Sequence, residues 1–289
     1  MELKLKNISK SYGEKEILSN INLEMNNGIY GLLGANGVGK STLFNIVSGY
    51  IRSDRGKVFY PKVNAKKEVL LSVLPQNFCG YPEMSILEFL EYIAMIKGDW
   101  NKKDIKREIK EKIEIFNLQS KAKNKLKTLS GGQLRRVGLA QAFLLNPRII
   151  LLDEPTTGLD PKERIQLKNY ISQQRKKQII FISTHIVPDL EDITDEIFML
   201  KNGNFVEEGE ENILLQKLQN KVWEIDGKDI DLCDNYDSNM IIVKEYQKDG
   251  EEKLRIISEQ QLYIPKRNLS PTLEDLYLLH FNGESYDKI

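Results

Sequence analysis

One stretch of nine residues constrains this chain more than any other feature, because it belongs to a single local architecture. It fits the pattern G-x-x-x-x-G-K-[ST], whose glycines let successive backbone N–H groups point at phosphate oxygens. An apolar run precedes it at residues 28–33, and apolar side chains follow it at helical spacing. This order predicts a strand, a glycine-rich loop and a helix whose N-terminus adds partial positive charge. The loop consists of Gly34, Ala35, Asn36, Gly37, Val38, Gly39, Lys40, Ser41 and Thr42.

Two side chains of this loop carry specific chemistry. Lys40 offers a mobile positive charge to the β- and γ-phosphates of a nucleotide, and Ser41 offers a hydroxyl oxygen to Mg²⁺. The other interpretation is a glycine-rich turn that fits the pattern by chance. The flanking strand and helix signals favour phosphate binding.

A second glycine-rich segment, Leu-Ser-Gly-Gly-Gln, occupies residues 129–133. Its Ser130 and Gln133 form an S-x-x-Q capping box, and an apolar helical pattern continues until Asn146 and Pro147 stop it. The Ser130 hydroxyl and the N–H groups of Gly131 and Gly132 therefore make a second anion site at a helix start. The alternative is a well-capped surface helix. One chain cannot easily aim two anion sites at one phosphate from opposite sides.

Two acidic residues, Asp153 and Glu154, follow an apolar run at residues 149–152. The run predicts a central strand buried on both faces. At its end, Asp153 is suited to hold Mg²⁺ through water, and Glu154 to polarise an attacking water as base or positioning group. Two adjacent carboxylates after a strand could equally begin an ordinary loop.

In order and spacing, these three segments resemble the nucleotide-binding subunits of ATP-binding cassette (ABC) proteins. The resemblance implies an ATP-sandwich dimer, in which the signature segment (residues 129–133) of one protomer closes over ATP on the P-loop (residues 34–42) of the other. It implies roles for four further residues: Tyr12 stacks on adenine, Gln76 touches Mg²⁺, Asp160 lies at the dimer contact and His185 senses the γ-phosphate. Without the family match, Tyr12 would be an ordinary strand aromatic, Gln76 a solvated loop residue, and His185 a hydrogen-bonded structural residue.

The resemblance also implies the fold. We expect an α/β P-loop NTPase core, with a mixed sheet and flanking helices, over residues 1–210. An α-helical subdomain is expected at about residues 82–134, and a small α+β accessory domain at residues 211–289. The accessory domain is expected to contain three short strands and a last helix opened by Ser270 and Pro271 as N-cap and first residue. This tail resembles that of exporter ATPase subunits whose membrane domain is a separate chain.

Two amphipathic helices are predicted inside the helical subdomain. The first begins at a capping box of Ser85 and Glu88, and the second is expected to turn Lys and Glu outward. The lysines of residues 102–127 either form a solvated surface or contact anionic lipid head groups. The expected apolar faces are Phe89, Leu90, Ile93 and Ile96 in the first helix, and Ile105, Ile109, Ile113 and Phe116 in the second.

Composition limits the classes of partner. Lys+Arg and Asp+Glu both total 42, so no net field attracts nucleic acid, and none is expected as a partner. Cys79 and Cys233 form no pattern, which fits a reducing cytoplasm. His280 has no companion ligands in the sequence, so no metal role is expected. No run approaches the roughly 18 apolar residues of a membrane span, so any pore must be another polypeptide.

We therefore predict an ATP-hydrolysing subunit that uses ATP and Mg²⁺ to power an ABC transporter, in the direction of export. A separate transmembrane permease and a homodimer or heterodimer of ATPase subunits are the expected partners. The expected location is the cytoplasm, at the inner face of the membrane. The alternatives are an importer subunit, a soluble ABC ATPase that acts on ribosomes or DNA, and a module that has lost hydrolysis. Glu154 and His185 argue against the last of these.

Overall fold

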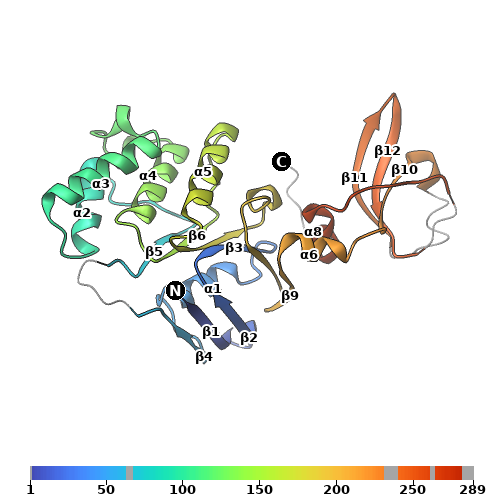
Figure 1. The fold of residues 1–289 in the computed structure, drawn as a ribbon, viewed down its shortest axis with the longest axis horizontal. Coiled ribbons are helices and arrows are strands. Elements are labelled where there is room, and N and C mark those ends of the chain that lie inside the picture. The colour runs from blue at the N-terminus through green and yellow to red at the C-terminus, as the bar shows by residue number, and fades with distance from the viewer. Residues whose placement is uncertain (1, 63–67, 231–239, 261–263, 282–289) are drawn as a thin grey trace. The chain divides into compact units, whose positions relative to one another are not determined.

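The computed structural model describes residues 2–62, 68–230, 240–260 and 264–281 (Figure 1). The chain divides into two compact units, Met1–Phe205 and Val206–Ile289. Cys233 lies outside the described residues, and Cys79 is a free, exposed cysteine. Across the described residues, no helix combines the length and the apolar character that crossing a membrane requires.

A six-stranded sheet forms the centre of the first unit. Its order is β5 (Leu71–Leu74), β6 (Ile149–Asp153), β7 (Ile179–Thr184), β3 (Gly28–Leu33), β8 (Glu196–Lys201) and β9 (Asn204–Gly209). The pairs from β5 to β8 are all parallel, and every residue of β3, β6 and β7 is buried, as their apolar sequences predict. A two-residue turn with positive φ at Asn202 and Gly203 then reverses the chain into β9, so the sheet is mixed.

The parallel strands bring the predicted site residues to one edge of this sheet. Carboxyl ends of parallel neighbours lie at the same edge, which is where α/β proteins bind ligands. The register pairs Leu33 with Thr184, Asp153 with Ser183, and Leu74 with Leu152. The P-loop, Gln76, Glu154 and His185 all follow these strand ends within a few residues.

A second sheet and one helix complete the core beside the P-loop. The antiparallel order is β2 (Lys15–Met25), β1 (Leu3–Tyr12) and β4 (Arg55–Phe59), and the helix is α1 (Lys40–Val47). Apolar residues of these strands share one buried cluster with α1, β3, β6 and β7. The rings of Phe44 and Phe181 lie 4.9 Å apart in that cluster, which fixes α1 and the P-loop before it against β7.

Helices cover the other side of β5 and β6 (Figure 1). They are α2 (Ile86–Ile96), α3 (Lys102–Ile115), α4 (Gly131–Phe143) and α5 (Pro161–Gln174), with short 3₁₀ turns η1 (Gln119–Lys121), η2 (Leu126–Thr128) and η3 (Val187–Asp189). The capping box of Ser85 and Glu88 is confirmed. The predicted apolar face of α2 is wrong at its end, because Ile96 is 62% exposed while the next residue, Lys97, turns toward β5 and α4.

The expectation that every Lys and Glu of α3 faces outward is also wrong. Lys112 is 1% exposed, and its stem crosses toward α5, where Nζ lies 5.9 Å from the centroid of the Tyr170 ring. Glu108 is buried beside it, and Glu111 accepts from Lys112 Nζ at 2.9 Å. A long lysine stem can bury its methylenes while its ammonium keeps a charged partner, which the helical pattern does not reveal. The predicted apolar positions of α3 are all buried.

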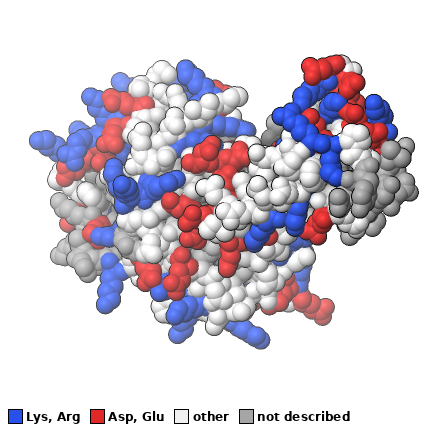
Figure 2. All heavy atoms as spheres, turned by 45° about the vertical axis from the view of Figure 1, so that its right-hand side comes forward, with Lys and Arg blue, Asp and Glu red and all other residues white. Residues whose placement is uncertain are grey.

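The described residues of the second unit include an antiparallel sheet and the helices α6 (Glu211–Gln216) and α8 (Leu273–Phe281). The sheet order is β11 (Ile241–Lys248), β12 (Glu251–Ile257), β10 (Val222–Asp226) and β13 (Arg267–Asn268), with η4 (Gly227–Asp229) after β10. Helices α6 and α8 flank it in sequence. Over the face drawn in Figure 2, Lys and Arg side chains lie among Asp and Glu side chains.

The predicted start of the last helix is wrong by two residues. Thr272, rather than Ser270, caps α8: Thr272 N donates to the Asp275 carboxylate at 2.7 Å, and Asp275 N donates to Thr272 Oγ1 at 3.3 Å. This reciprocal capping box outweighs the Ser-Pro signal. Arg255 of β12 donates two further hydrogen bonds to the fully buried Asp275, so the helix start is tied to the sheet of its own unit.

Candidate active site

An open cavity of about 280 Å³ lies at the carboxyl edge of the central sheet. It brings together residues from the P-loop, from the end of β1, from the loop after β5 and from the end of β6. Its lining residues are Tyr12, Ile17, Asn36, Gly37, Gly39, Lys40, Ser41, Thr42, Gln76, Asp153 and Glu154.

Glycines shape the P-loop around an ammonium group. Gly39 has a φ of 113°, and a Cβ there would lie 2.9 Å from Ile17 Cγ2, so no other residue fits. Lys40 is buried, and its Nζ donates to the carbonyls of Gly34 at 2.7 Å and Ala35 at 3.0 Å. Burial lowers the pKa of Lys40, while Glu154 acts in the opposite direction. The loop therefore holds its lysine in place for an incoming anion.

Glu154 adopts an unusual backbone conformation at the end of β6. Its φ is 51°, in the left-handed region, and its side chain is 3% exposed. Oε1 lies 2.8 Å from His185 Nδ1 and 3.9 Å from Lys40 Nζ, and Oε2 lies 3.4 Å from Thr184 Oγ1. A lysine, a carboxylate and an imidazole thus converge beside the P-loop.

Three side chains with oxygen atoms that could bind a metal ion line the same cavity: the Ser41 hydroxyl, the Gln76 amide and the Asp153 carboxylate. Asp153 is buried, and its Oδ1 accepts a hydrogen bond from Ser183 Oγ on β7, which orients the carboxylate. Mg²⁺ prefers oxygen ligands, and in nucleotide sites it takes few from the protein and the rest from phosphate and water. The residues present therefore fit Mg²⁺.

The signature segment does not line this cavity. Its predicted capping box is confirmed: Gln133 N donates to Ser130 Oγ at 3.3 Å, and Ser130 N donates to Gln133 Oε1 at 3.1 Å. Ser130 is exposed. Gly132 packs against the loop after β6, where a Cβ would lie 2.5 Å from the Gly158 carbonyl oxygen. The start of α4 therefore lies outside the P-loop cavity of its own chain.

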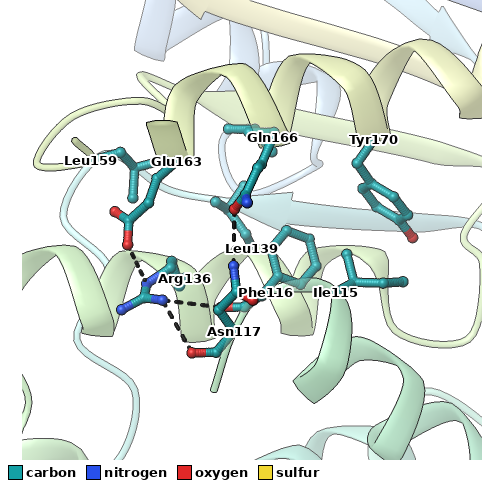
Figure 3. Close-up of a pocket in the computed structure, with 10 residues that line it drawn as sticks. Ile115, Phe116, Asn117, Arg136, Leu139, Leu159, Glu163, Gln166 and Tyr170 are labelled. Carbon is teal, nitrogen blue, oxygen red and sulfur yellow. Dashed lines mark hydrogen bonds and ion pairs between the residues drawn. The ribbon is translucent and has the colours of Figure 1, made fainter. Parts of the chain in front are cut away.

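Asp160 caps α5 and begins a chain of contacts between three helices. Its Oδ1 accepts from Glu163 N at 2.8 Å, and Glu163 Oε1 lies 3.2 Å from Arg136 Nε (Figure 3). Arg136 Nη1 donates to the carbonyl of Asn117 at 3.1 Å, and Asn117 Nδ2 donates to Gln166 at 2.9 Å. The small cavity of Figure 3 shares no lining residue with the P-loop cavity.

Sequence reasoning missed two buried residues of the site. Asp189 accepts from the Oγ1 atoms of Thr156 and Thr184, and burial raises its pKa. No local pattern marks it. Arg135 is 5% exposed and donates to carbonyls around Glu154. One signal was present, because Arg135 shares a helix face with Leu139 and Ala142 at spacings of four and seven.

A mixed sheet with this P-loop, an acidic strand end and a capped Leu-Ser-Gly-Gly-Gln helix define an ABC-type ATPase. The chain belongs to the ABC transporter ATP-binding proteins, and the family model described as "ABC transporter" matches residues 18–157. It is therefore a nucleotide-binding, ATP-hydrolysing subunit of an ABC transporter.

Relatives include exporter and importer proteins. The uncharacterized ABC transporter ATP-binding protein YxlF of Bacillus subtilis (strain 168) is 31% identical, covering 78% of this chain and 77% of its own. The Nod factor export ATP-binding protein I of Rhizobium etli is 30% identical, and the match covers 97% of this chain and 93% of the relative. A probable sulfate/thiosulfate import ATP-binding protein, CysA of Chlorella vulgaris, is 32% identical, and the match covers 72% of this chain and 91% of the relative.

Solved structures agree with the fold. An ATP-binding subunit of an ABC transporter superposes with a TM-score of 0.68 at 25% identity, covering 75% of this chain and 93% of that chain. A bacterial ABC transporter cassette solved as a dimer gives 0.63 at 28% identity, covering 72% and 98%. ATPase cassettes of this family dimerise and work with transmembrane components.

Proposed function

We propose that this chain binds Mg-ATP on its P-loop and hydrolyses it at sites shared between two ATPase subunits, so as to drive export through a separate permease. The observation that carries the proposal is the convergence of Glu154, His185 and Lys40. Glu154 Oε1 lies within 2.8 Å of the imidazole and 3.9 Å of the ammonium. In our proposal Lys40 neutralises the β- and γ-phosphates, Glu154 receives the proton of the attacking water, and His185 contacts the γ-phosphate.

The remaining site residues take the roles implied by the family. Ser41, Gln76 and Asp153 would hold Mg²⁺, which neutralises charge on the phosphates when bound. Tyr12 would stack on adenine from the rim of the cavity, where its ring is 53% exposed. Backbone N–H groups of residues 34–42 would cradle the phosphates, as the helix start at α1 favours.

The signature segment, in which Ser130 and Gly131 are exposed, supports a shared site. Ser130, Gly131, Gly132 and Gln133 begin α4 yet contribute nothing to the cavity of their own chain. We propose that they close over ATP bound to a second subunit, identical or homologous, and that Asp160 lies at that contact. ATP would then favour the closed dimer by binding it more tightly than the open state.

We propose export over import because one relative named for export aligns over nearly the whole chain. The Nod factor export relative aligns over 97% of the chain, so the match includes most of residues 211–289, which we take as an accessory domain after a core of residues 1–210. The import relative covers 72%. We further propose that residues 82–134 form the helical subdomain, and that the chain works in the cytoplasm at the inner face of the membrane, bound to its permease.

The catalytic proposal is tested with Glu154→Gln. The amide is nearly isosteric but cannot accept a proton, so ATP should bind while turnover stops and a dimer accumulates. Light scattering with Mg-ATP measures the dimer, and Glu24→Gln on exposed β2 is the matched control. Turnover at the wild-type rate by Glu154→Gln would remove Glu154 from the chemistry.

The direction is tested by comparing cells that express the wild type with cells that express Glu154→Gln. Small molecules in the medium and inside the cells are quantified together. A compound that is lost from the medium and accumulates inside the variant cells supports export. A compound that remains in the medium of the variant cells and is missing inside would support import instead.

A further inference from the structure

Arg135 joins three segments of the site through one guanidinium group. It lies in the second turn of α4, five residues after Ser130. All five hydrogen bonds that it makes within the described part of the chain end on backbone carbonyls. The acceptors are the carbonyls of Pro75 at 2.8 Å, Gln76 at 3.0 Å, Pro155 at 3.3 Å, Asp153 and Glu154.

Such a contact set is unusual for a charged group. Arg135 is 5% exposed, and burying a charge is costly unless its donors are matched. A guanidinium has five N–H donors in a rigid plane, so it can span carbonyls that a single ammonium could not reach together. Burial lowers the pKa of Arg135 to about 10, which leaves it charged at neutral pH.

Two of its acceptors belong to the strained end of β6. Glu154 has a φ of 51°, in the left-handed region that an L-residue adopts only at a cost in free energy. Surrounding contacts must maintain it. Glu154 N donates to Ser183 O at 2.9 Å on one side, and the Glu154 carbonyl accepts from Arg135 Nη2 on the other. These two bonds hold the peptide whose side chain meets His185.

The next residue, Arg136, makes contacts with other parts of the structure. Arg136 extends toward α5 and the end of α3, where it meets Glu163 and the Asn117 carbonyl (Figure 3). Successive residues on a helix lie about 100° apart, so the pair reaches two different neighbours. Arg136 links α4 to α5 and to the end of α3. Arg135 instead links α4, the helix that begins at the signature segment (the signature helix), to the strand end that carries Glu154.

We propose that Arg135 is a positioning residue, which holds Glu154 in its left-handed conformation and links the signature helix to the loop of Gln76. It does not line the P-loop cavity, and it acts through the backbone of Glu154. A shift of α4 on contact with a second subunit would therefore move Glu154 and Gln76 together. This inference builds on the role proposed above for Glu154.

Amide hydrogen exchange of the full-length chain tests the inference directly. Arg135→Gln should speed exchange at least tenfold in peptides covering residues 73–79 and 150–158, and leave other peptides unchanged. Arg135→Lys keeps the charge but loses the planar fork, so it should show a smaller increase at the same two places. Gln141→Met is the matched control, since Gln141 lies on α4 and also donates to a carbonyl, that of Val73 at 2.7 Å.

Steady-state kinetics give the second readout. Arg135→Gln should lower kcat for ATP at least tenfold with KM within twofold, while Gln141→Met stays near wild type. Wild-type exchange at residues 150–158 in a folded Arg135 variant would overturn the inference, as would an equal local increase in Gln141→Met. Should Arg135→Gln fail to fold, Arg135→Lys decides by the same exchange criterion. The ATPase rate of Glu154→Gln, measured in parallel, tests the proposed catalytic role of Glu154. Amide exchange in the Arg135 variants tests the positioning role of Arg135 separately, because exchange does not depend on whether Glu154 takes part in catalysis.

Discussion

The Nδ1 atom of His185 lies 2.8 Å from Oε1 of Glu154, and this contact joins the ends of two parallel strands. A carboxylate can only accept, so Nδ1 carries the proton and donates. The second ring nitrogen, Nε2, then remains for another partner. Because β6 and β7 pair in register up to Asp153 and Ser183, the two side chains meet without any distortion of the sheet.

Replacement of this imidazole should uncouple binding from hydrolysis. His185→Ala leaves the P-loop intact, so the ATP dissociation constant should change by less than about twofold. Turnover should fall roughly 100-fold, the size of effect usual for a group that takes part in proton transfer or its organisation. A coupled-enzyme assay measures it, and His280→Ala, which alters the other histidine of the chain, is the control. Full turnover by His185→Ala would contradict the proposed role.

The ring of Tyr12 should contribute to nucleotide affinity. It stands at the rim of the P-loop cavity, with Lys10 Nζ 5.5 Å from its centroid. Loss of base stacking costs roughly 1–3 kcal/mol, so Tyr12→Ala should weaken ATP binding about 5- to 150-fold, while Tyr12→Phe should not. Fluorescent-ATP titration measures both. Tyr50→Ala, at an 83% exposed tyrosine outside the cavity, should bind ATP normally.

Lys40 should be indispensable for binding. Its ammonium is the full positive charge of the P-loop, and the Gly34 and Ala35 carbonyls already hold it beside the cavity. Charge-assisted hydrogen bonds contribute about 1.5–3 kcal/mol each, so Lys40→Ala should lose more than about 100-fold in ATP affinity. Lys57→Ala, on the exposed strand β4, is the control for a general charge effect. An unchanged affinity would mean that nucleotide binds elsewhere.

Lys97 gives a prediction about stability rather than catalysis. Its Nζ donates to Ser72 Oγ at 2.9 Å and to the carbonyls of Gln141 and Leu144, which ties the end of α2 to β5 and α4. Burial lowers the pKa of Lys97 from 10.5 to about 7. Between these two values the unfolded state binds more protons than the folded state, so stability rises with pH.

The variant Lys97→Met should lack this rise. In urea unfolding at pH 7.5 and pH 9, the wild type should gain stability relative to Lys97→Met by up to about 1.4 kcal/mol per pH unit. The gain should level off as pH approaches 10.5, where the unfolded lysine also loses its proton. Parallel pH curves for the two proteins would show that Lys97 stays fully charged in the folded state.

Local sequence patterns predicted the strands that precede the P-loop and Asp153, both capping boxes that flank the helical subdomain, and the P-loop and acidic residues that line the cavity. These features depend on contacts within a few residues. Tyr12 and Gln76 were expected from the family resemblance alone, and Ile17 was not predicted. The errors lie where distant contacts decide. Lys112 is buried because α5 presents Tyr170 to its stem, and α8 begins at Thr272 because Asp275 completes a capping box there. The helix face that Arg135 shares with Leu139 and Ala142 marks it as buried, but the partners that Arg135 and Asp189 find at Glu154 and Thr156 are distant in sequence and follow from no local pattern.

A disulfide crosslink tests most directly whether two chains share each ATP site. Cys79 and Cys233 are first replaced by Ser in a Glu154→Gln background, and two differently tagged copies are mixed. One carries Asn36→Cys in the P-loop, and the other carries Ser130→Cys at the start of α4. Oxidation with Mg-ATP should give a covalent dimer of the two tags, and oxidation without nucleotide should give none. Normal ATP binding by both copies with no mixed crosslink would contradict a site built from the P-loop of one copy of this chain and the signature segment of another.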